Sequence, residues 1–132
     1  MSALGRSWRF QVRNTTGTTS GACSIDGYRW KPGTSGEADY ETSPVSFFTA
    51  SSIASGAYAN GNTYNNDDTG AGFYGLSGLM TMLNGSGTGN FEIYIQQSSD
   101  GGTTWPTDGR GELVRTVNCD VASTQVRRSI NL

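Results

Sequence analysis

The stretch FEIYIQQ at positions 91–97 alternates apolar and polar side chains, and this two-residue period is the strongest indication of the fold class. Side chains of a β-strand point alternately to opposite faces, so Phe91, Ile93 and Ile95 would share one face. Three other stretches show a similar alternation: 7–13, 113–119 and 124–132. Strands with one buried and one solvent-facing side are typical of antiparallel sheets.

The alternation also predicts which residues form the core. The inward sets are Trp8, Phe10 and Val12; Leu113, Val117 and Cys119; and Val126, Ile130 and Leu132. Arg115 would lie on the same strand face as Leu113, and Arg128 on the same strand face as Val126. We expect the side chains on the other face of each strand, which include Gln11 and Gln96, to face solvent.

Three weaker stretches complete the predicted sheets. In 22–31 the apolar parity changes, which indicates a bulge or bend at Gly27. The stretch 45–51 contains Phe47 and Phe48, and the glycine-interrupted stretch 73–83 is favoured as a long strand over a short helix. Turn pairs rich in Gly, Asn and Asp separate the segments. The chain therefore predicts one all-β domain over 1–132, an antiparallel β-sandwich or jelly roll of about seven or eight strands.

The segment 50–72 has the weakest pattern, and we expect a long loop there. It contains Tyr58 and Tyr64 among Asn, Ser and Gly, which is either a contact surface or a solvated surface loop. Asp67 and Asp68 supply oxygens of the kind that Ca²⁺ prefers, but their spacing lacks the EF-hand pattern and favours a solvated turn.

Composition limits the classes of partner. Only 15% of the residues are charged, the net charge is −2 and the pI is about 4.9, so a nucleic-acid partner is not expected. No stretch is apolar enough to span a membrane, and the N-terminus lacks the apolar segment of a signal peptide. Cys23 and Cys119 are expected as buried free thiols, with a disulfide between them as the alternative.

Residues for common catalytic chemistry are scarce. The chain has no His, which excludes Ser-His-Asp and Cys-His arrangements and histidine metal sites. No phosphate-binding loop motif occurs. Two of Asp100, Asp108 and Glu112 would form a glycosidase pair only if the fold placed them around a cleft. We therefore expect no enzyme activity, no catalytic residue, no metal and no cofactor.

The most specific motif is SSDGGTTW at positions 98–105. Asp100 can accept backbone N–H bonds within the turn, and Gly102 can adopt positive φ. Thr104 is expected to start the return strand, and Trp105 to fold back onto the hairpin. The serine of the motif is Ser98.

These residues fit the pattern S-x-D-x-G-x-T-W, which resembles the Asp-box of sialidases and other β-rich proteins. The wider stretch 73–132 resembles small accessory virion proteins of tailed bacteriophages, in which a strand precedes a D-G-G-T-T-W turn. The resemblance implies a non-enzymatic structural protein that decorates a capsid or joins tail or fibre parts. It also implies synthesis in the host cytoplasm, location in the virion, and assembly with other virion proteins or as a homo-oligomer or array.

The candidate interface residues are Trp30, Tyr58, Tyr64, Arg127 and Arg128. Long Arg stems can cover apolar surface while the guanidinium group pairs across an interface. The alternative function is a carbohydrate-binding module that contacts a host surface glycan. In that case Tyr28, Trp30 and the segment 58–64 would line the site.

Overall fold

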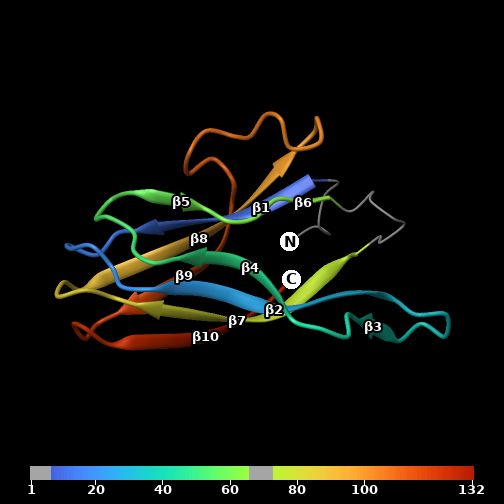
Figure 1. The fold of residues 1–132 in the computed structure, drawn as a ribbon, viewed down its shortest axis with the longest axis horizontal. Helices are drawn as coiled ribbons and strands as arrows, with labels where there is room; N and C mark the ends of the chain where they lie inside the picture. Colours follow the sequence, from blue (N-terminus) through green and yellow to red (C-terminus); the bar gives the residue numbers. More distant parts are fainter. Residues whose placement is uncertain (1–6, 66–72) are drawn as a thin grey trace.

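A computed structural model describes residues 7–65 and 73–132, which form strands and turns without a helix (Figure 1). The first sheet contains β1 (Ser7–Asn14), β5 (Tyr58–Asn60), β6 (Tyr64–Asn65), β8 (Gly89–Ser98) and β9 (Glu112–Cys119). The second sheet contains β2 (Cys23–Pro32), β3 (Ala38–Tyr40), β4 (Val45–Ala50), β7 (Gly75–Leu83) and β10 (Gln125–Asn131). Every strand pairing is antiparallel, so the predicted all-β sandwich is confirmed.

The strand number is higher than predicted: ten instead of seven or eight. The first sheet has the order β5-β1-β8-β9, and β6 pairs with another part of β1. The second sheet has the order β10-β7-β2-β3, and β4 pairs with another part of β2. In each sheet two short strands therefore share one edge. The sequence predicted β4 as the stretch 45–51 but missed β3, β5 and β6, because two or three residues are too few to show an alternation.

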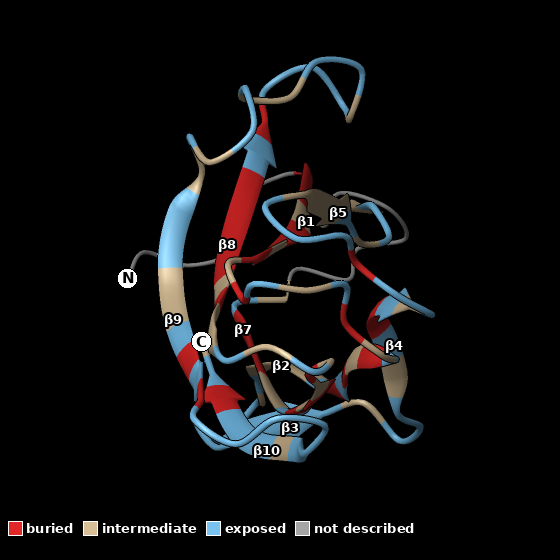
Figure 2. Cartoon of the chain, turned by 90° about the vertical axis from the view of Figure 1, so that its left-hand side faces the viewer, coloured by how far each residue is buried: buried red, intermediate tan, exposed pale blue. Residues whose placement is uncertain are grey.

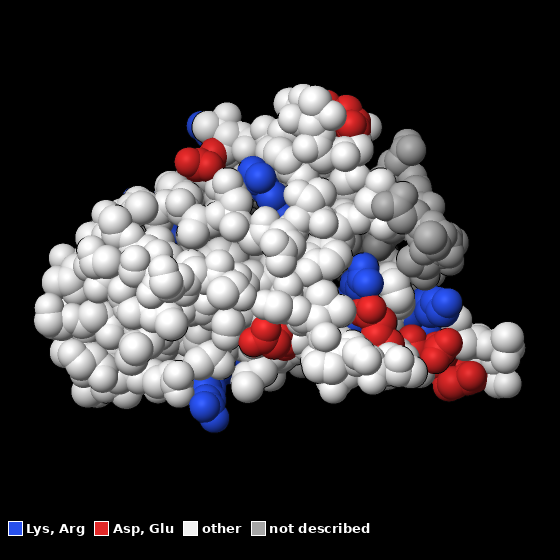
Figure 3. Space-filling model, in the orientation of Figure 1, with Lys and Arg blue, Asp and Glu red and all other residues white. Residues whose placement is uncertain are grey.

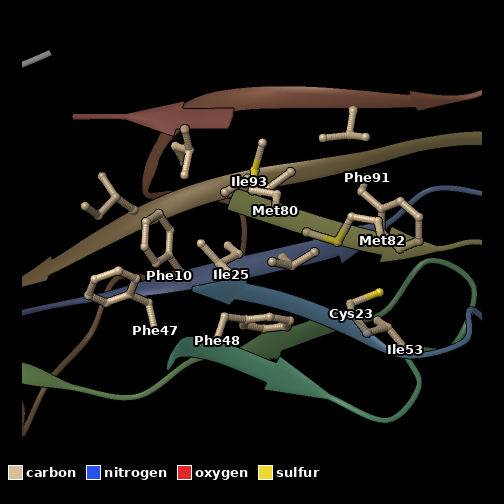
Figure 4. Packing of buried hydrophobic residues seen from close by; sticks show 14 of the residues in the cluster. Phe10, Cys23, Ile25, Phe47, Phe48, Ile53, Met80, Met82, Phe91 and Ile93 are labelled. Carbon is tan, nitrogen blue, oxygen red and sulfur yellow. The ribbon is translucent and has the colours of Figure 1, made fainter. Parts of the chain in front are cut away.

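The core lies between the two sheets and receives large side chains from both (Figure 4). Phe10 comes from the first sheet and Phe47 from the second, and their ring centroids lie 6.1 Å apart. Trp8 is fully buried and contacts both of these rings at 5.8 Å. Aromatic contacts of this kind add to the free energy of burial and hold the two sheets together.

Two register shifts decide which neighbouring residues point inward. Phe47 and Phe48 are both buried because the β2–β4 pairing shifts between Ile25 and Asp26. The bulge or bend expected at Gly27 is wrong: β2 pairs with β7 without a shift from Cys23 to Trp30, and the extra residue lies in β4.

A second shift corrects the predicted inward set of β9. The β8–β9 pairing shifts between Ile93 and Tyr94. As a result Val114 packs against the core, whereas Leu113 is 50% exposed. The inward position expected for Leu113 is wrong because simple alternation does not account for an extra residue in the strand.

The segment 50–72 is not a continuous loop, which corrects another expectation. Its part before residue 66 contains β5 and β6, and both strands pair with β1. Asp67 and Asp68, the weak calcium candidates, lie outside the described residues.

Candidate functional site

The motif at 98–105 forms a closely hydrogen-bonded turn at the end of β8. The Asp100 Oδ1 atom accepts the backbone N–H groups of Thr103 and Thr104 at 3.1 and 2.8 Å. The Ser98 hydroxyl donates to the same oxygen at 2.7 Å and accepts the N–H of Gly102 at 3.0 Å. The backbone φ of Gly102 is +92°, a conformation that a residue with a Cβ adopts only with strain. These bonds order the turn.

Trp105 closes the turn from one side. Its indole N–H donates to the Gly102 carbonyl at 3.1 Å, and the guanidinium group of Arg9 lies 4.3 Å from its ring centroid. The return strand, however, begins at Glu112, so the expectation that Thr104 starts it is wrong. The turn opens instead into a loop, 99–111, that folds over the first sheet.

Loop 99–111 covers the outer face of β1 and β8, which was expected to face solvent. The side chain of Gln11 on β1 is fully buried beneath the loop. Its amide nitrogen donates to Asn60 and Asp108 at 2.9 and 2.8 Å. Its carbonyl oxygen accepts the N–H of Gly109 at 3.1 Å and the amide of Gln96 at 3.3 Å. Polar outward residues therefore form a buried network, because the loop supplies their partners.

The carboxylates of this region, Asp100, Asp108 and Glu112, lie in different surroundings. Hydrogen bonds from Ser98 and Thr104 hold the pKa of Asp100 well below its usual range, so Asp100 stays ionised and is unsuited to act as a general acid. The Asp108 carboxylate accepts the Gln11 amide, and Glu112 is exposed at the start of β9. Within residues 7–65 and 73–132, no group of three or more Cys, Asp or Glu residues could hold a metal ion.

The two cysteines are free and buried. Burial raises the pKa of the Cys23 thiol, although a hydrogen bond with Ser20 opposes the shift. Burial and the proximity of Cys23 raise the pKa of Cys119 as well. Thiols in this state behave as small apolar groups of the core.

The tyrosines proposed for an interface lie on opposite sides of the first sheet. Tyr64 pairs with Trp8 and stacks on its ring at 5.0 Å, so it packs against the core. Tyr58 pairs with Arg13, whose guanidinium group lies 5.3 Å from the Tyr58 ring centroid on the outer side. The structure therefore does not gather Tyr58, Tyr64 and Trp30 into one surface.

Trp30 lies on the outer face of the second sheet, where its ring packs in a fixed position. A Cβ atom on Gly75, directly opposite in β7, would lie 2.6 Å from the indole nitrogen. The indole thus lies over the glycine, and its N–H donates to the Leu132 carbonyl at 3.3 Å. Behind this end of β2, Arg29 forms a bidentate pair with Glu41, with distances of 2.7 and 2.9 Å. The glycine opposite and the indole hydrogen bond hold the position of the Trp30 ring, and the ion pair fixes the neighbouring residue of β2.

Three exposed tyrosines surround Trp30. Tyr40 of β3 is its direct cross-strand neighbour and is 50% exposed, and Tyr28 is two residues away on the same face of β2 and is 40% exposed. Tyr74 is 54% exposed, and its ring is nearly parallel to the indole, with centroids 6.4 Å apart. We call Tyr28, Trp30, Tyr40 and Tyr74 the aromatic platform. Sequence reasoning named Tyr28 and Trp30 but missed the other two, because only the pairing of β2 with its neighbours brings them together.

Arg127 and Arg128 lie on β10, a mainly exposed strand (Figure 2). As successive residues of one strand they point to opposite faces. Arg127 shares the outer face of the second sheet, and Arg128 points toward the side of the sandwich where β9 lies. On this side the Arg115 guanidinium donates to the Ser129 carbonyl at 2.8 Å and so connects β9 with β10.

Comparison of the chain with protein-family models, with curated proteins and with solved structures gives no match. In the part of the chain that the structure describes, no helix has the length and apolar character to cross a membrane.

Proposed function

We propose that this chain is a non-enzymatic structural protein of a phage virion, which acts through protein–protein contacts as a capsid decoration or as a tail or fibre adaptor. The resemblance of 73–132 to accessory virion proteins supports this function. In the structure that stretch includes β7, β8, β9, β10 and loop 99–111, which together span both sheets. The carboxylate arrangement described above supports the non-enzymatic part of the proposal.

The observation that carries the proposal is the side of the sandwich formed by β9 and β10, which we call the β9–β10 side. Both strands are sheet edges, because β9 pairs with β8 and β10 pairs with β7. Leu113 on β9 is 50% exposed and Val121 in the β9–β10 turn is 63% exposed. Apolar side chains next to an open strand edge are features that a protein partner can cover.

Three arginines add polar contacts to this side. Arg115, Arg127 and Arg128 pair with no carboxylate among the described residues, although Arg115 and Arg128 donate to backbone carbonyls. Their aliphatic stems can cover apolar surface, and their guanidinium groups can bind carboxylates of a partner bidentately. A second copy of the chain or another virion protein could also add a strand at the β10 edge.

Charge reversal on the β9–β10 side tests the proposal. We expect the purified chain to form an oligomer in size-exclusion chromatography with light scattering, or to bind purified virion components. Arg127→Glu and Arg128→Glu should each weaken that association at least tenfold, because an acidic side chain cannot form the same contacts. Arg110→Glu is the charge-matched control, since Arg110 is exposed on loop 99–111 away from this side.

A chain that stays monomeric and binds no virion component would contradict the proposal. Equal weakening by Arg110→Glu would show a general effect of charge and would contradict the assignment to the β9–β10 side.

A further inference from the structure

The aromatic platform is separate from the β9–β10 side and has features of a ligand site. All three tyrosines that rank among the exposed large apolar residues of the described chain belong to it. Aromatic side chains are normally among the more buried residues, so their grouping on one open sheet face needs an explanation beyond packing.

The central ring of the platform is fixed before any ligand arrives. Gly75 leaves the room that the Trp30 indole occupies, since a Cβ there would also lie 1.9 Å from the Leu132 carbonyl oxygen. The Leu132 carbonyl accepts the indole N–H and holds the ring against the sheet. One side of the ring is thus covered by β7, the Tyr74 ring lies near-parallel to the indole, and Trp30 as a whole is only partly buried. A rigid ring loses little conformational entropy when it binds a ligand.

Polar groups lie beside the aromatic rings on the same sheet face. Ser77 is opposite Tyr28, and its hydroxyl donates to Asn131 at 2.9 Å. This bond uses the Asn131 carbonyl oxygen, and the Asn131 amide nitrogen has no partner among the described residues. Asp26 is exposed two residues before Tyr28 on the same face of β2. The face therefore combines stacking surfaces with hydrogen-bonding groups.

The charges near the platform disfavour an anionic ligand. Figure 3 shows few charged side chains on the face it displays, with acidic and basic groups side by side at the β3 end. Near the platform, Asp26, Glu37 and Asp39 provide acidic groups, and Lys31 faces Asp39 across the β2–β3 pairing. Arg29 is already paired with Glu41. A neutral ligand meets no repulsion from this arrangement.

We propose that the aromatic platform binds a neutral saccharide, whose pyranose rings stack on Trp30 and the adjacent tyrosines. A pyranose ring has an apolar face of C–H groups that suits an aromatic surface, and hydroxyl groups at its rim that suit Ser77 and Asn131. The near-parallel rings of Trp30 and Tyr74 offer stacking surfaces to two neighbouring sugar units. This inference goes beyond the proposed structural function and does not depend on it.

Affinity electrophoresis of the purified chain in gels with soluble polysaccharides tests the inference. The panel contains galactomannan, xyloglucan, mixed-linkage glucan and soluble starch as neutral probes, with polygalacturonate and heparin as anionic probes. We expect at least one neutral polysaccharide to retard the chain. Trp30→Ala and Tyr40→Ala should each weaken this binding at least tenfold, and Tyr58→Ala, on the outer side of the other sheet, should leave it unchanged.

Tyr40→Ala keeps the test valid if Trp30→Ala fails to fold, because the Tyr40 side chain is exposed at a sheet edge. Retardation by none of the neutral probes, or by the anionic probes alone, would overturn the inference. So would equal loss of binding in Tyr58→Ala. Platform variants that abolish association with virion proteins while no saccharide binds would assign the surface to a protein partner instead. Arg128→Glu should bind saccharide normally, because Arg128 points away from the outer face of the second sheet, and this variant separates the inference from the proposed function.

Discussion

Replacement of Gln11 by Met should destabilise the protein although the two side chains have similar size. The wild-type amide makes four hydrogen bonds, with Asn60, Gln96, Asp108 and Gly109. Each is worth about 1 kcal/mol net, so their sum gives about 4 kcal/mol as an upper value. Asn60 and Asp108 are exposed and regain hydrogen bonds with water. We therefore expect the free energy of unfolding to fall by about 2–3 kcal/mol.

Urea unfolding at 25 °C measures this change, and limited trypsin digestion at Arg110 measures the order of loop 99–111. Gln97→Met is the matched control, since Gln97 lies on the same strand as Gln96 but is exposed. The control should change the free energy of unfolding by less than about 0.5 kcal/mol. Cleavage at Arg110 should become faster in Gln11→Met alone. A Gln11→Met protein as stable and as resistant to trypsin as the control would refute the argument that this network holds the loop.

Three further predictions concern the strand packing, the turn and the core. Gly27→Ala should destabilise the protein by about 3 kcal/mol or more in urea unfolding, since its Cβ would lie 2.2 Å from the Ser77 backbone oxygen, whereas Gly17→Ala, with open space, should have little effect. The Asp100 carboxyl should titrate by NMR with a midpoint below the ordinary Asp pKa of about 4, because hydrogen bonds from Ser98 and Thr104 lower its pKa; its contribution to stability is present above the ordinary pKa and is lost as the pH falls through the lowered folded value. A midpoint near pH 4 would contradict the hydrogen-bonded turn. Cys23 and Cys119 should not react with a thiol reagent at pH 8 in the native protein, and both should react in guanidinium; rapid native reaction of either would contradict their burial.

The two-residue alternation was sufficient to predict the sandwich and most of its core. It works for β1 and β8, where Trp8, Phe10 and Ile93 are all buried as the rhythm requires. It fails at Leu113, because a bulge inverts the parity and depends on the partner strand. It also fails at Gln11. The alternation predicts that this polar residue faces solvent, but loop 99–111, which is distant in sequence, covers it.

The candidate interaction surfaces were less predictable than the core, because they combine residues of strands that are distant in sequence. Arg127 and Arg128 could be placed on a strand from local sequence, but the proximity of β9 to that strand is a property of the sandwich. Tyr40 and Tyr74 lie far from Trp30 and from each other in the sequence. Only the pairing of β2 with β3 and β7 brings them beside Trp30. A site assembled across strands leaves no local motif to find.

The proposed function makes its most direct claim about where the chain resides. Electron cryomicroscopy of purified particles of the proposed phage, combined with mass spectrometry of their proteins, measures that directly. We expect density for the sandwich on the capsid, tail or fibre, with the strands β9 and β10 against a neighbouring protein. Recovery of the chain from infected cells but never from the particles would contradict it.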